Sequence, residues 1–341
     1  MASLLVGIMV ASLVLYALLA GADYGAGVWD LLSAGSLKEE QEELIANAIQ
    51  PIWEANHVWL ILIIVLLFSG FPPAFGAIMV ALFVPILLML TGIVLRGSSF
   101  VFRAYSTVDS RMQHACAYVF SMSSCFTPLF AGIIVGALSG DRIFVAQDVS
   151  VNGYVLNWLN PFTVSVGLLT VALFAFLAAA YLIVEASSEE LKSAFRRRAV
   201  AAGVAVGIMA ALTSILSAWY ARGLRDSFMH NTVARWSVLT AGIAFAVAFF
   251  ALYGRRDRLL RAMAAIHIGG IVVGWASSQY PYLVRPDRTI FNSVLSETVV
   301  RDIVFASAAG AVVLFPSLAL LLYVFKDQRR SNAASSTEAR P

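Results

Sequence analysis

Nine apolar segments of about 20 residues recur along the chain, and they constrain its fold more than any other feature. A helix of about that length crosses the roughly 30 Å hydrocarbon core of a bilayer. The chain is 60% hydrophobic and 13% charged, which excludes an ordinary soluble domain. We predict an all-α polytopic membrane protein with spans near Ser3–Asp23, Pro51–Phe71, Ala74–Leu95, Ala115–Leu138, Pro161–Val184, Ala199–Tyr220, Trp236–Tyr253, Ala262–Leu283 and Ile303–Phe325.

The loops between these spans predict how the chain is oriented in the membrane. With the N-terminus outside, sixteen of the 23 Lys and Arg residues fall in inner loops, Arg96 among them. Because positive residues favour the cytoplasmic side, we predict an N-out, C-in orientation. Residues 1–326 form the predicted transmembrane domain, and 327–341 a cytoplasmic tail too poor in apolar residues to fold, which we predict to be disordered. The first span lacks the basic n-region of a cleaved signal peptide, so we keep it as a span.

Charge and cysteine content point to no further class of site. The net charge of +3 is small, so we predict no nucleic-acid partner. Cys116 and Cys125 lie in one apolar segment without a CxxC motif or a run of Cys and His at metal-ligand spacing. We interpret both as small packing residues, and we predict no metal site.

The segment Ile49–Trp59, IQPIWEANHVW, is the leading candidate for a functional site. It places a carboxylate, an amide and an imidazole between two indoles, immediately before the apolar run Leu60–Phe68. Charged groups inside a membrane are costly, so those present are functional candidates. These five side chains belong to Trp53, Glu54, Asn56, His57 and Trp59.

Asp23 and Glu54 are the carboxylates that we expect within or just inside a span, both toward the cytoplasmic side. Together they would suit the uptake of protons or cations. Glu54 and His57 are three residues apart and therefore neighbours on one helical face. The structural alternatives stay open: Asp23, in GADYGAG, could cap a helix or bond to another helix, Glu54 could be purely structural, and His57 could only hold Glu54. We interpret His267, in AAIHIGG, as a packing residue.

Histidine is a usual haem ligand, so the four imidazoles were considered as a bis-His site. His57 is expected near the inner face, His114 at the start of the fourth span, His230 in an outer loop and His267 in the eighth span. These positions do not pair at one depth on facing helices. We predict that this chain alone binds no haem.

Several motifs along the chain resemble one known family, subunit II of the cytochrome bd-type quinol oxidases, which includes the cyanide-insensitive oxidases. The matching segments are GADYGAGVWDLL, AIQPIWEANHVWLI with FPPAFGAI, LRGSSFVFR, NPFTVSVGLLTVA and SSQYPYLV. The resemblance implies two four-helix bundles plus one peripheral helix, in agreement with the nine spans counted above. It also implies a multi-pass protein of the bacterial cytoplasmic membrane.

The resemblance further implies a haem-free subunit that forms a heterodimer with a haem-bearing subunit I, which oxidises quinol and reduces dioxygen to water. The implied proton path to the oxygen-reducing haem passes Glu54, with Asp23 as the acid of GxDxG. Some relatives carry aspartate and glutamine at the positions of Glu54 and His57. A quinone or lipid held between helices and a small single-helix third subunit are compatible with the family.

Two other functions are compatible with a chain of this composition. A cation-coupled secondary transporter would bind its ion near mid-membrane. We disfavour it, because the carboxylates are expected toward one face and no mid-membrane charge pair is expected. A purely structural subunit, in which the acids hold helices together, is the second alternative.

Overall fold

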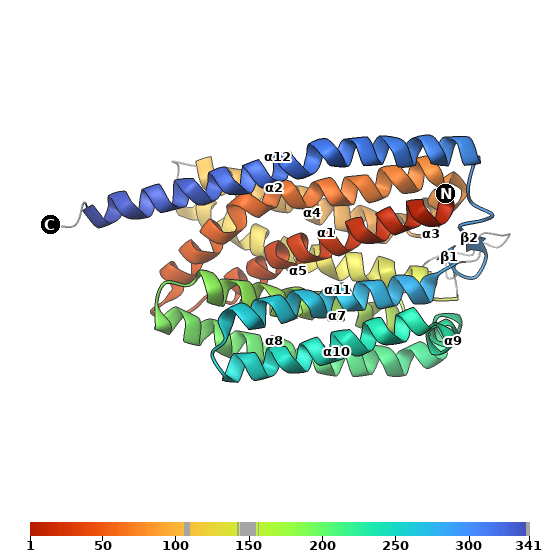
Figure 1. Cartoon of the computed structure of the whole chain (residues 1–341). Helices are drawn as coiled ribbons and strands as arrows, with labels where there is room; N and C mark the ends of the chain where they lie inside the picture. The colour runs from red at the N-terminus through yellow and green to blue at the C-terminus, as the bar shows by residue number, and fades with distance from the viewer. Residues whose placement is uncertain (106–109, 142, 144–154, 156, 339–341) are drawn as a thin grey trace.

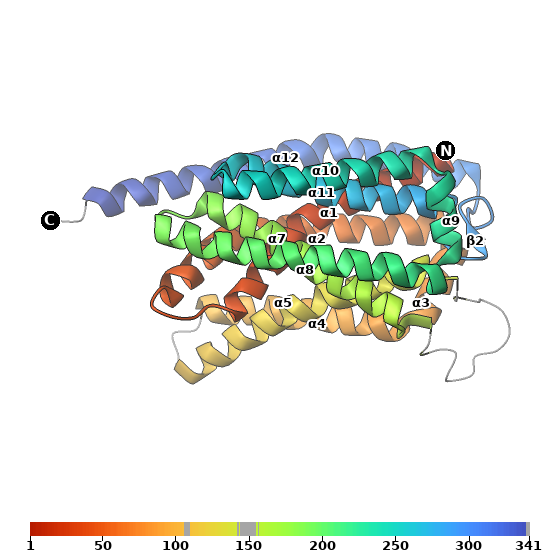
Figure 2. The same ribbon diagram turned by 90° about the horizontal axis from the view of Figure 1, so that it is seen from below.

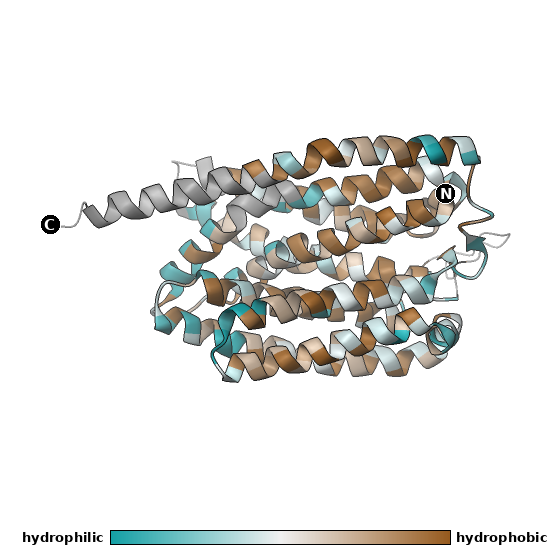
Figure 3. Cartoon of the chain, viewed as in Figure 1, coloured by the Kyte–Doolittle hydropathy of each residue, from teal (hydrophilic) through white to brown (hydrophobic). Residues whose placement is uncertain are grey.

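The computed structural model is a long helical bundle in which nearly all helices run parallel to one axis (Figure 1). The chain's two ends lie at opposite ends of this bundle, as an odd number of membrane crossings requires. Polar residues gather at both ends and apolar residues fill the middle (Figure 3). The structure describes residues 1–105, 110–141, 143, 155 and 157–338, and their side chains except those of 49–55, 103–105, 110, 319 and 321–338.

In the described part of the chain, nine long helices form two groups of four and one outlier. The first group is α1 (Ala2–Leu31), α2 (Lys38–Gly70), α4 (Phe83–Tyr105) and α5 (Ser110–Ser139). The second is α7 (Pro161–Glu185), α8 (Glu189–Tyr220), α10 (Thr232–Tyr253) and α11 (Asp257–Gln279). The outlier, α12 (Glu297–Glu338), packs on α2 and α1 and runs along α2 in Figure 1, whereas in Figure 2 it lies on the far side of the bundle. The prediction of two four-helix bundles plus one peripheral helix is confirmed.

The described residues contain eight helices long and apolar enough to cross a membrane. A ninth crossing results if Asn56–Gly70 of α2 and the short helix α3 (Pro72–Ala81), bent by 117° at their junction, count as one span. The predicted third span, Ala74–Leu95, is wrong as a single helix, because α3 ends at Ala81 and α4 begins at Phe83. The break has a local cause: the ring of Pro85 would clash with the carbonyl group of Ala81, four residues earlier.

Several helix ends lie beyond their predicted bounds. α1 continues eight residues past Asp23, and α4 continues to Tyr105, so Arg96 is a helix residue and its assignment to an inner loop was wrong. α12 is helical as far as Glu338, which differs from the disorder predicted from residue 327. No proline stands between Pro316 and Pro341, so no residue of this segment forces the helix to end.

The end of the bundle where the N-terminus lies, which the sequence predicts to be the outer end, carries two short elements that join the bundles. They are α9 (Arg222–His230) and an antiparallel hairpin of β1 (Tyr282–Val284) and β2 (Arg288–Thr289). The buried Arg285 side chain in this hairpin donates to the backbone oxygen of Ser278 and to the Ser227 hydroxyl, both at 2.8 Å. Burial lowers the pKa of the Arg285 guanidinium, and the nearby Asp141 carboxylate opposes that shift.

Two arginines of α8 join helices at the other end of the bundle, and their predicted place in an inner loop was wrong because both are helix residues. The Arg196 guanidinium pairs with the Asp257 carboxylate at 3.0 Å, joining α8 to α11. Arg198 donates to the backbone oxygen of Leu32 at 2.9 Å and to the Gln41 side chain at 2.6 Å, joining α8 to the turn between α1 and α2.

Candidate functional site

The inner half of α1 lies at the centre of the molecule because its residues are small. A β-carbon at Gly25 would overlap the backbone oxygen of Phe174 on α7, and one at Gly27 would overlap the Ser124 hydroxyl on α5. The Trp29 indole donates to the backbone oxygen of Ala175 at 2.8 Å. Small residues permit this close approach of helices in a membrane. Asp23, within the same stretch, is therefore enclosed on all sides and only 1% exposed.

Asp23 forms a buried ion pair with Arg96 of α4. The Arg96 Nη2 lies 2.7 Å from Asp23 Oδ1 and its Nη1 lies 2.9 Å from Oδ2, so the pair is bidentate. Arg96 Nη2 also contacts the backbone oxygen of Asp23 at 3.2 Å. The Asp23 side chain is fully buried and that of Arg96 is 1% exposed. The pair joins two candidate spans, Ala2–Leu31 and Phe83–Phe102, and it was not foreseen from the sequence.

The remaining faces of the Arg96 guanidinium are also occupied. Its Nε donates to the Ser124 hydroxyl of α5 at 2.8 Å. Its central carbon lies 4.7 Å from the centre of the Tyr24 ring and 4.5 Å from that of Phe120. Aromatic faces stabilise a cation, and the effect is larger away from water. Arg96 is thus held by charge, hydrogen bonds and rings at once.

Asn56 brings α2 into the same cluster. Its Nδ2 donates to Asp23 Oδ2 at 2.7 Å, and the residue is fully buried. A carboxylate accepts hydrogen bonds but cannot donate them, which fixes the orientation of the amide. The Asn56 Oδ1 atom accepts no hydrogen bond from the described part of the chain, so a buried acceptor is available beside the ion pair.

A second carboxylate lies seven residues further along α1, on the same helical face. Asp30 is 7% exposed and accepts a hydrogen bond from the Ser121 hydroxyl of α5 at 2.7 Å. Seven residues are two helical turns, or about 10 Å toward the end that is predicted to be cytoplasmic. Asp23 and Glu54 were expected from the sequence to be the only acids within or just inside a span, and so Asp30 was missed. The predicted first span ended at Asp23, whereas α1 continues to Leu31.

The predicted motif in α2 is described only in part. The side chains of Trp53 and Glu54 lie outside the described residues, although both positions belong to the helix. His57 is half-buried, and its imidazole lies within electrostatic range of Asp23 and Arg96. Trp59 is buried, and its ring centre lies 6.0 Å from that of Phe315, so it contacts the peripheral helix α12.

The structure thus brings Asp23 and Asn56 into direct contact and places His57 beside them. Sequence reasoning missed Arg96, Asp30, Ser121 and Ser124. The spacing of seven between Asp23 and Asp30 was a usable signal, since it puts both acids on one face. Nothing in the sequence pairs Arg96 with Asp23, because that contact joins residues 73 positions apart.

The imidazoles do not gather into one site among the described residues. His267 is buried, and its Nδ1 lies 2.9 Å from the backbone oxygen of Ala241. This contact agrees with a packing role, although the described residues offer no partner to its Nε2. His230 is exposed on α9 at the outer end. In the same described part, no three His, Cys, Asp or Glu residues are placed to hold a metal ion.

Comparison with known proteins reveals one consistent similarity. The sequence model described as cytochrome bd terminal oxidase subunit II matches residues 1–325. The chain is 21% identical over 330 residues to the putative cytochrome bd menaquinol oxidase subunit II of Bacillus subtilis, covering 93% of both proteins. It is 22% identical over 323 residues to the cytochrome bd-I ubiquinol oxidase subunit 2 of Escherichia coli K12, covering 86% of this chain and 83% of that protein.

A solved structure has the same fold. The bd oxidase from Geobacillus thermodenitrificans contains a chain that superposes with a TM-score of 0.78, at 22% sequence identity. The match covers 95% of this chain and 98% of that one. The helical arrangement described above is therefore shared with a bd oxidase.

Proposed function

Because the chain belongs to the subunit II family of cytochrome bd terminal oxidases, we propose that it carries protons from the cytoplasmic side to a haem-bearing subunit I. Subunit I would oxidise quinol and reduce dioxygen to water, and its haems would supply the redox chemistry. The present chain would support subunit I, hold no haem of its own and reside in the bacterial cytoplasmic membrane. A small third subunit would be compatible with this assembly.

One observation carries the proposal: a buried polar cluster, made of two hydrogen-bonded groups, lies inside an apolar bundle and includes a residue of the helix that bears Glu54 and His57. Its members come from all four helices of the first group. Buried polar groups are costly in a membrane interior, and they are expected where ions or protons move. One group joins Asp23, Asn56, Arg96 and Ser124, and the other pairs Asp30 with Ser121.

Within this cluster we assign Asp23 the role of a fixed charge. A carboxylate that receives two hydrogen bonds from a guanidinium and one from an amide has its negative charge balanced in place. Taking up a proton would leave the Arg96 cation buried without a partner. Asp23 would therefore orient Asn56 and set the local potential while other groups carry the proton.

Glu54 and His57 are the residues that we assign to proton transfer. They are three residues apart on α2 and therefore neighbours on one helical face. A carboxyl group and an imidazole can each take up and release a proton near neutral pH when their surroundings bring the pKa of the group close to neutral. Asp30, nearer the cytoplasmic end, would lie at the start of the route.

The alternative of a purely structural subunit also has support. The Asp23–Arg96 pair joins α1 to α4, and Asn56 adds α2, which is what a scaffold would require. The two functions differ in what happens when Glu54 loses its ability to ionise. A scaffold role predicts poor assembly, whereas proton transfer predicts an assembled enzyme that turns over slowly.

The test compares Glu54→Gln with Glu40→Gln, an exposed acid on the same helix, in the purified oxidase complex. Oxygen consumption with excess quinol measures turnover, and the haem absorption spectrum measures assembly. We expect Glu54→Gln to slow oxygen consumption with an unchanged spectrum, and Glu40→Gln to do neither. Equal turnover in both variants would remove Glu54 from the path.

A further inference from the structure

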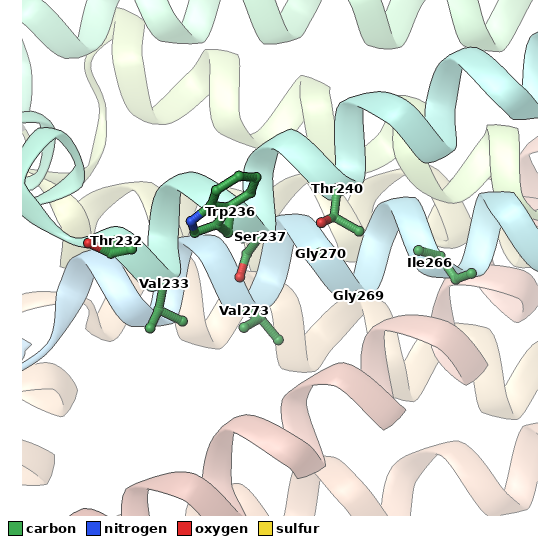
Figure 4. A pocket seen from close by; sticks show the side chains of 9 residues that line it. All are labelled: Thr232, Val233, Trp236, Ser237, Thr240, Ile266, Gly269, Gly270 and Val273. Carbon is green, nitrogen blue, oxygen red and sulfur yellow. The ribbon is translucent and has the colours of Figure 1, made fainter.

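A groove runs along the outer half of α10 and α11, away from the polar cluster (Figure 4). Its volume is about 470 Å³, within the range of roughly 300 to 1,000 Å³ found for small-molecule sites. Most of its lining is apolar, with hydroxyl groups from α10 along one wall. The residues used below are Thr232, Trp236, Ser237, Thr240, Gly269 and Val273.

The hollow has a cause in the sequence of α11. At Gly270 a β-carbon would lie 2.9 Å from both the Ala241 side chain and the Ser237 backbone oxygen, so the two helices touch there. At Gly269 a β-carbon would meet only Val14, at 3.7 Å, so this glycine leaves space that a side chain would have filled. Close contact beside a missing side chain produces a groove along the helix pair.

The groove is about as long as one acyl chain of a phospholipid, and it begins at the membrane surface. Thr232 is the first residue of α10 at the outer end, and Thr240 lies about 12 Å further into the membrane. That distance is close to half of the roughly 30 Å hydrocarbon thickness. Trp236 is 63% exposed on the groove wall, in the zone where tryptophan anchors proteins at the membrane surface.

A positive charge stands at the outer end of the groove. Arg235 is exposed and donates to the Thr232 hydroxyl at 3.4 Å, which places its guanidinium at the rim. Within the described chain Arg235 makes no ion pair. A guanidinium suits a phosphate group, since it offers two parallel hydrogen bonds as well as charge.

We propose that this groove binds an anionic phospholipid of the outer leaflet, with an acyl chain between α10 and α11 and the phosphate against Arg235. Apolar walls alone would accept any hydrocarbon chain. The exposed arginine at the membrane surface favours an anionic headgroup over a zwitterionic one. This site is separate from the proposed proton path and does not depend on it.

The test uses native mass spectrometry of the oxidase complex, exchanged into phosphatidylglycerol or phosphatidylcholine of equal chain length. Val273→Phe narrows the groove, and Ile243→Phe, an exposed site on α10 outside the groove, is its control. We expect the wild-type complex and Ile243→Phe to retain one more phosphatidylglycerol than Val273→Phe. Thr240→Phe, also on the groove wall, should repeat the loss if Val273→Phe fails to assemble.

The charge is tested by Arg235→Gln, with Arg301→Gln, an exposed arginine on α12, as its control. We expect Arg235→Gln alone to weaken phosphatidylglycerol retention about five-fold, the size of one arginine contact at a membrane surface, and to leave phosphatidylcholine unaffected. Equal retention of both lipids by the wild-type complex would overturn the proposal. So would equal retention in Val273→Phe and Ile243→Phe, or loss of a quinone instead of a phospholipid.

Discussion

Replacing Asp23 with asparagine tests whether the buried pair is a fixed structural charge. The substitution keeps the shape of the side chain but leaves the Arg96 cation, 1% exposed, without its counter-charge. Removing one partner of a buried ion pair costs about 3–5 kcal/mol, because the other charge stays buried. We therefore expect Asp23→Asn to destabilise the oxidase complex by that amount.

The double variant Asp23→Leu, Arg96→Met distinguishes the cost of removing the whole ion pair from the cost of leaving one charge unpaired. Replacing a whole buried ion pair with apolar side chains is often close to neutral. The double variant should therefore be more stable than either single change, with a coupling energy of about 3 kcal/mol in a double-mutant cycle. Denaturant unfolding of the purified complex, followed by the haem absorption, measures each corner of the cycle.

Asp302→Asn is the matched control, since Asp302 pairs with Arg301 at an exposed site and should show no measurable change. The reasoning would be refuted if Asp23→Asn unfolded like this control yet slowed oxygen reduction. Asp23 would then be a proton carrier, and the pair would not fix its charge.

Three further predictions concern helix contacts and proton transfer. Gly25→Ala should abolish assembly of the complex, since its β-carbon would overlap the α7 backbone, whereas Gly7→Ala, with open space around it, should assemble normally; gel filtration distinguishes them. Trp59→Ala should lower the melting temperature of the complex by removing packing against α12, while Trp219→Ala, 60% exposed, should not; equal melting would contradict this contact. His57→Gln should slow oxygen consumption with intact haem spectra, because an amide forms hydrogen bonds but takes up no proton; unchanged turnover would leave His57 only an orienting role.

The helical fold follows from the sequence because a membrane fixes the length of each apolar crossing. The predicted helix ends were least accurate where a helix continues past its apolar run. α1 and α4 extend beyond their predicted ends, since neighbouring helices cover the polar residues there. Hydropathy places Arg96 in a loop, because a lone arginine is costly inside a membrane. In the structure the buried carboxylate of Asp23 balances the charge of Arg96, which stabilises it inside the bundle.

The candidate site was predictable where polar residues interrupt an apolar run. Asp23 and Asn56 were found in this way, and they do meet. Ser121 and Ser124 were missed, because hydroxyl groups are common in membrane helices and only the fold shows that these two contact Asp30 and Arg96. The assignment of Glu54 to proton transfer stays a prediction.

Proton uptake during a single turnover tests the central claim most directly. The fully reduced complex is mixed with dioxygen in weakly buffered solution containing a pH-sensitive dye, and proton uptake is timed against haem oxidation. For Glu54→Gln we predict that uptake and haem oxidation both slow, whereas Glu40→Gln behaves as the wild type does. Uptake at the wild-type rate in Glu54→Gln would contradict the claim that this chain delivers the protons through Glu54.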